Sequence, residues 1–149
     1  MLARALFQVG DLDGTIAAAE PARGSSQRQA IEELLAVAFL RKGRLAEASQ
    51  AFERALEAGP NPQLLFGLGV ALAGHGRDRE AARTLEQLVA LAPRTAPAWV
   101  ELAAVYQRLG RAEDRRQAAE TARRLAPAAS ADAEFRCGLE AYAKGDLAG

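Results

Sequence analysis

The stretch GRLAEASQAFERALEAGP, residues 43–60, returns twice in related form with its spacing intact. GRDREAARTLEQLVALAP covers residues 76–93, and GRAEDRRQAAETARRLAP covers residues 110–127. The leading glycines, at positions 43, 76 and 110, recur at steps of 33 and 34 residues, a period typical of stacked pairs of helices. Each copy therefore predicts one structural unit.

Apolar and small residues on both sides of each glycine predict two helices per unit. Leu35, Ala36 and Phe39 precede Gly43 by eight, seven and four residues, spacings that share one helix face. A glycine can adopt the positive φ that often ends a helix, and the later proline cannot continue the second one. Each unit is predicted to be an antiparallel hairpin. The matching face of the second helix holds Ala48, Phe52 and Ala55 after Gly43, and Ala81, Leu85 and Leu88 after Gly76.

Composition predicts an all-α, soluble protein, for which a cytoplasmic location is favoured. Half of the 149 residues are hydrophobic, but only 5% are aromatic. The 19 basic and 19 acidic residues cancel, so no overall charge favours nucleic acid or an anionic membrane. No apolar run approaches the roughly 20 residues that cross a bilayer, so membrane insertion is not expected.

The spacing in the third unit resembles the signature of the tetratricopeptide repeat, carried by Trp99, Leu102, Ala103, Tyr106, Gly110 and Pro127. The resemblance covers nearly the whole chain. It implies one right-handed superhelical solenoid of antiparallel helix hairpins over residues 1–149. The expected repeats are 29–61, 62–95 and 96–130, with partial repeats at 1–28 and 131–149.

The first partial repeat departs from the pattern. Pro21 falls inside its expected second helix and should end or kink that helix near Glu20. Ser26 and Gln29 have the spacing of a capping box, which predicts the start of the next helix.

By the same resemblance, the first helices line the concave face of the solenoid and form a groove. Some family members hold a chaperone tail there with Lys, Asn and Arg, but this sequence has apolar residues at the matching positions, so that role is not expected. The groove is predicted to have an apolar floor, a polar margin and exposed anchors at Phe66, Phe135 and Tyr142, while Val37, Val70 and Ala104 are expected to be partly buried. The groove residues are Glu33, Val37, Leu40, Arg41, Phe66, Val70, Ala73, Gly74, Val100, Ala104, Gln107, Arg108, Phe135, Leu139 and Tyr142.

No catalytic or metal-binding pattern emerges, so neither an enzyme nor a cofactor is expected. His75 is the only histidine and is expected in a solvated turn, while Cys137 is the only cysteine and takes an apolar repeat position. Arg115 stands where the other units have alanine and either alters helix packing or extends to solvent. The arginines near it are offset by acids and lack interleaved aromatics, so nucleic-acid binding is not favoured.

Three functional hypotheses remain open at this stage. The first is an interaction scaffold that binds a peptide or helix of a partner protein in the groove. The second is self-assembly into homo-oligomers through the incomplete terminal repeats. The third is an adaptor segment of a larger protein.

Overall fold

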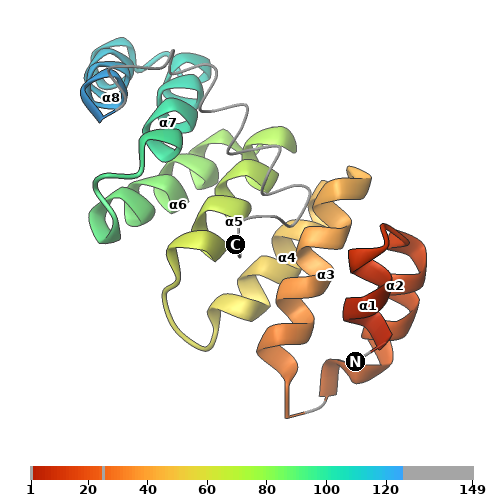
Figure 1. The fold of residues 1–149 in the computed structure, drawn as a ribbon. Coiled ribbons are helices and arrows are strands. Elements are labelled where there is room, and N and C mark those ends of the chain that lie inside the picture. Colours follow the sequence, from red (N-terminus) through yellow and green to blue (C-terminus); the bar gives the residue numbers. More distant parts are fainter. Residues whose placement is uncertain (1, 25, 126–149) are drawn as a thin grey trace.

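The computed structural model describes residues 2–24 and 26–125, which form eight α-helices and one 3-10 helix (Figure 1). No β-strand occurs within these residues. The helices follow one another as four antiparallel hairpins, α1 with α2, α3 with α4, α5 with α6 and α7 with α8. Their bounds are α1 Leu2–Gln8, α2 Leu12–Ala19, η1 Glu20–Gly24, α3 Arg28–Lys42, α4 Leu45–Leu56, α5 Pro62–Gly74, α6 Asp78–Leu91, α7 Ala96–Arg108 and α8 Ala112–Leu125.

Each hairpin turns at a glycine with left-handed backbone, as the sequence predicts. The φ angles of Gly10, Gly43, Gly76 and Gly110 are 85°, 77°, 81° and 74°. After Gly43, the amide of Arg44 donates to the Phe39 carbonyl at 2.9 Å, and the same bond recurs after Gly76 and Gly110. This bond satisfies a carbonyl that the end of the helix would leave without a partner.

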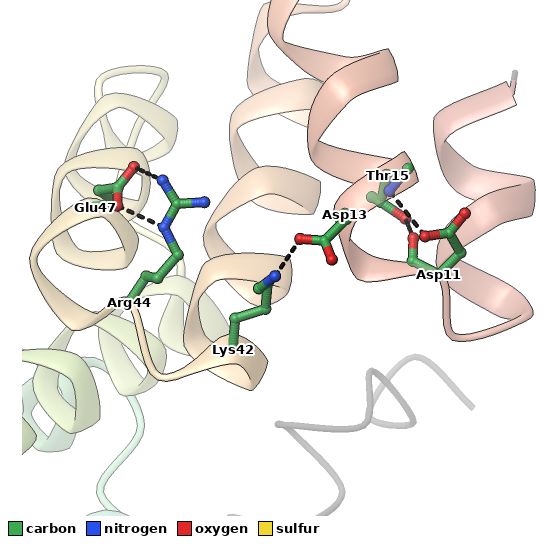
Figure 2. A network of polar contacts seen from close by, with 7 residues as sticks. Asp11, Asp13, Thr15, Lys42, Arg44 and Glu47 are labelled. Carbon is green, nitrogen blue, oxygen red and sulfur yellow. Dashed lines mark hydrogen bonds and ion pairs between the residues drawn. The ribbon is translucent and has the colours of Figure 1, made fainter.

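The residue after three of these glycines is an arginine that pairs with an acid three positions later. Arg44 Nε lies 2.6 Å from Glu47 Oε1, as Figure 2 shows. Arg77 pairs with Glu80 and Arg111 with Asp114 in the same way. The acid lies in the first turn of the second helix, where the helix dipole favours negative charge.

Small residues allow the two helices of a hairpin to approach closely. Ala36 and Ala48 are fully buried in the second hairpin. In the third hairpin Gly69 is required, because a Cβ there would lie 2.7 Å from Leu85 Cδ2. The apolar face predicted around each glycine is therefore the interior of its hairpin.

The start of α3 differs from the sequence prediction, while the end of α2 agrees with it. Helix α2 ends at Ala19, and Pro21 lies in η1, as its rigid ring led us to expect. The predicted capping box at Ser26 is wrong. Helix α3 begins at Arg28 with Gln27 as its N-cap and has no side-chain cap hydrogen bond.

The hairpins stack so that the first helices α3 and α5 each contact both the preceding and the following hairpin. Helix α5 packs against α4 and α6, and also touches α3 and α7. The first helices therefore lie side by side (Figure 1). This is the all-α solenoid that the sequence predicts. In the described ranges, no helix has both the length and the apolar character needed to cross a membrane.

Candidate partner-binding surface

The candidate site is a row of side chains across the neighbouring helices α3, α5 and α7, which we call the inner stripe. Helix α5 contacts both α3 and α7. These contacts bring together residues that lie more than 60 positions apart in sequence. The inner stripe comprises Glu33, Val37, Leu40, Arg41, Phe66, Val70, Ala73, Val100, Ala104, Gln107 and Arg108.

Most apolar members of the inner stripe are half-buried. Val37, Val70 and Ala104 lie in this class, as the stacking of units leads us to expect. Phe66 is different, with only 7% of its surface exposed. The prediction that it is an exposed anchor is therefore wrong, because Phe66 is part of the hydrophobic core that runs through the hairpins. The other predicted anchors, Phe135 and Tyr142, lie with Leu139 outside the described residues.

Both arginines of the inner stripe are engaged with the preceding hairpin. The Arg41 guanidinium lies over the Phe7 ring, 5.0 Å from its centroid. Arg108 Nε lies 2.9 Å from Asp78 Oδ1 at the start of α6. These side chains connect neighbouring hairpins as well as forming the polar margin.

A further ion pair of this kind, Lys42 with Asp13, joins α3 to α2 (Figure 2). Sequence reasoning missed both Lys42–Asp13 and Arg108–Asp78. The signal available was positional: each acid lies two or three residues after a turn glycine, and each cation one or two before the next.

Glu101 adds a buried carboxyl next to Val100, with 8% of its surface exposed. Burial raises the pKa of this carboxyl above its usual range, and the nearby Arg108 guanidinium opposes part of that rise. Its repeat counterparts are Leu34 and Gly67, so the pattern of the other units does not suggest a polar residue.

Tyr106 of α7 makes polar contacts with the preceding hairpin and with the turn that follows α7. Its hydroxyl donates to Glu86 Oε1 at 2.7 Å, and the Arg111 guanidinium lies 4.5 Å from the ring centroid. Burial and the hydrogen bond to Glu86 raise the pKa of the Tyr106 hydroxyl. The hydroxyl therefore stays protonated at neutral pH and acts as a hydrogen-bond donor between α6 and α7.

The other residues singled out in the sequence do not add chemistry to this surface. His75 is exposed at the C-terminal end of α5, as expected. Arg115 is exposed too, and α8 buries only Ala118 and Ala122. Within residues 2–24 and 26–125, no group of three or more His, Cys, Asp or Glu side chains is placed to hold a metal ion. Cys137 lies outside these ranges.

Comparison with protein families gives two overlapping matches. The model of the tetratricopeptide repeat family matches residues 1–61 and again residues 33–94. A curated relative, the TPR repeat-containing thioredoxin TTL4 of Arabidopsis thaliana, is 40% identical over 78 residues, which cover 52% of this chain. The match spans only 11% of that relative's length.

Solved structures share the arrangement of hairpins. A crystal structure of MamA superposes with a TM-score of 0.82 at 19% identity, covering 99% of this chain and 93% of that one. A MamA structure from AMB-1 gives 0.80 at 24% identity, with coverage of 90% and 74%. A tetratricopeptide repeat protein from Parabacteroides merdae ATCC 43184 gives 0.79 at 17% identity, with coverage of 94% and 57%. At these identities the likeness concerns the fold.

Proposed function

This chain belongs to the tetratricopeptide repeat family, and from that premise we propose that its inner stripe binds a helix or peptide of a partner protein. The family and the solenoid support a protein-interaction scaffold in general. The observation that carries the finer proposal is the row of half-buried apolar residues at one repeat position, Val37, Val70 and Ala104, across three touching helices. The part of each side chain that the core does not cover offers apolar surface to a partner.

The chemistry of the inner stripe suits an amphipathic segment. Apolar side chains at the centre would accept anchors spaced along one face of a partner helix. At the α7 end, Gln107 and Arg108 are exposed and supply polar contacts. Because Arg108 already pairs with Asp78, a partner carboxylate would compete with that ion pair.

The test replaces two half-buried stripe residues, Val70→Glu with Ala104→Glu, and identifies bound proteins by affinity capture and mass spectrometry. We expect capture of the stripe partner to fall at least tenfold, because two carboxylates would be forced against an apolar segment. Gln50→Glu on the exposed side of α4 is the matched control and should capture normally. Equal capture by both variants, with equal helical circular dichroism, would contradict the proposal.

A second candidate function is self-assembly, favoured by an exposed face of α1. Ala5 is exposed, whereas its repeat counterparts Ala38, Ala71 and Val105 are fully buried. Val9, which directly follows this helix, is 78% exposed. A hairpin from a second copy would cover this face as the chain's own hairpins cover the three counterparts.

A further inference from the structure

Two carboxyl side chains are buried within residues 2–24 and 26–125, and only one of them is ion-paired. Glu32 is 2% exposed, and its Oε1 lies 3.4 Å from Arg23 Nε. A terminal nitrogen of Arg54 lies 3.9 Å from the other carboxylate oxygen, Oε2. Two guanidinium groups from neighbouring elements therefore balance the charge of Glu32.

Glu101 is the other buried carboxyl, with 8% of its surface exposed. It makes no hydrogen bond and no ion pair with any side chain that the structure describes. The Arg108 guanidinium lies near enough to attract it, but Arg108 Nε donates to Asp78 Oδ1 at 2.9 Å. Because a buried carboxylate without a partner is destabilising, the free chain is less stable for carrying this side chain.

The repeat itself does not require a carboxyl at this position. The counterparts of Glu101 in the two preceding units are Leu34 and Gly67, and neither can carry a charge. Those units form the same helix hairpin without it. A buried ionisable group that destabilises the free protein and that the fold does not need is typical of a functional site.

Glu101 lies beside the inner stripe. Val100 precedes it directly, while Ala104 and Arg108 follow three and seven residues later, at spacings that share one helix face. Val100 and Ala104 are short, half-buried side chains, so the carboxyl lies just beneath the surface of the stripe. A lysine or arginine side chain of a bound segment can lay its apolar stem on such a surface and bring its charge to the carboxyl.

The other charged side chains of the inner stripe favour a cationic partner group over an anionic one. The Arg41 guanidinium lies over the Phe7 ring, and Arg108 pairs with Asp78. Glu33 of α3, by contrast, makes no hydrogen bond or ion pair with the rest of the described chain. The stripe thus has carboxylates without counterions on α3 and beside α7, while its arginines are engaged by the chain's own side chains.

We propose that Glu101 accepts a lysine or arginine side chain of the partner segment, and that it selects segments with a basic residue beside their apolar anchors. Because it names the chemistry of the stripe partner, this role rests on the function proposed above. Hydrogen bonds from a cation to a carboxylate are shorter and stronger than those between neutral groups. Glu101 would therefore determine specificity, while the apolar stripe residues supply most of the contact area.

The test selects peptides from a phage-displayed library on the full 149-residue chain and on its variants. The library holds helical peptides with leucines at positions i, i+3 and i+7 and random residues elsewhere. Peptides that bind the unaltered chain and are lost on Val70→Glu bind the inner stripe. We expect these peptides to carry lysine or arginine at one fixed position relative to the leucines. Selection on Glu101→Gln should lose that preference.

Calorimetry on a selected peptide then measures the interaction between the two side chains. Replacing its basic residue by norleucine, which keeps the apolar stem, should weaken binding to the unaltered chain by about tenfold or more. The same replacement should have little effect on binding to Glu101→Gln, because the double-mutant cycle isolates this one pair. Glu101→Leu, which introduces the residue of the first complete repeat, should behave as Glu101→Gln does. Glu53→Gln, at an exposed position on α4, is the control and should keep the full preference.

The possible failures separate this role of Glu101 from the function of the stripe. If no peptide is retained, or if the unaltered chain and Val70→Glu retain the same peptides, both proposals are wrong. If stripe-dependent peptides show no basic preference, or keep it on Glu101→Gln, only the role of Glu101 is wrong. A preference that is lost on Glu33→Gln instead would identify Glu33 as the acceptor and would also contradict the role of Glu101.

Discussion

Single residues at equivalent repeat positions have different physical roles in this chain. Glu32, Leu65 and Trp99 share one position, yet the first is a buried carboxylate, the second a buried apolar side chain and the third a hydrogen-bond donor. Glu32 Oε2 has no hydrogen-bond partner among the described residues. Burying a carboxylate lowers the free energy of unfolding unless the carboxylate is paired. Burial of Glu32 therefore depends on its ion pairs with Arg23 and Arg54. The repeat preserves position while the chemistry changes.

Glu101 gives the clearest prediction for a single residue. Because burial raises its pKa in the folded state, the folded chain binds this proton more tightly than the unfolded chain does. Its contribution to stability is therefore present below the unfolded-state pKa and is lost as pH rises through the folded-state pKa. Glu101→Gln should reduce the decrease in the free energy of unfolding between low pH and pH 7.5. At pH 7.5 the variant should therefore be more stable than the unaltered chain.

Urea unfolding at pH 4 and pH 7.5, followed by circular dichroism, measures the difference. Glu53→Gln, at an exposed position on α4, is the control and should leave the pH dependence unchanged. A variant at Glu101 that is less stable at pH 7.5 would mean that attraction to Arg108 outweighs the cost of burial.

At the scale of elements, the helix hairpin depends on a left-handed residue at its turn. Gly43 has a φ of 77°, and a Cβ at this position would meet nothing within 4 Å. Gly43→Ala should therefore destabilise the chain by backbone strain alone, about 1 kcal/mol. Thermal and urea unfolding measure this loss.

Gly24 supplies the matched comparison for that substitution. A Cβ there would also meet nothing within 4 Å, but its φ is not in the left-handed region. Gly24→Ala should leave stability unchanged or raise it slightly, because alanine restricts the unfolded chain. If both substitutions had the same effect, the turn conformation would not explain the recurrence of glycine.

At the scale of the whole molecule, each hairpin is stabilised by its neighbours, as in other repeat proteins. Helix α1 exposes Ala5, whose counterparts in the later repeats are buried, and Val9 directly after the helix is exposed as well. If a second copy covers these residues, light scattering over a concentration series should show an increase in mass. Ala5→Glu should abolish that increase, while Gln50→Glu on α4 should not. A constant monomer mass would exclude self-assembly of this chain.

The amino-acid sequence by itself determined the helix hairpins, their period and their turns. These features depend on local chemistry: apolar residues at helical spacing, glycine where φ is positive, and proline where a helix must stop. That is why residues 43–60 and their two related copies predict the solenoid, and why Pro21 predicts the end of α2.

Only the tertiary structure decided which side chains of the inner stripe are accessible and which spaces remain between hairpins. Phe66 is buried because core residues of neighbouring elements surround it, which its own position in the repeat does not reveal. A cleft beside Leu65 arises in the same way, from side chains of three different elements and the volume that they leave unfilled. Burial and cavity volume depend on the size of every neighbour, and those neighbours come from distant parts of the chain.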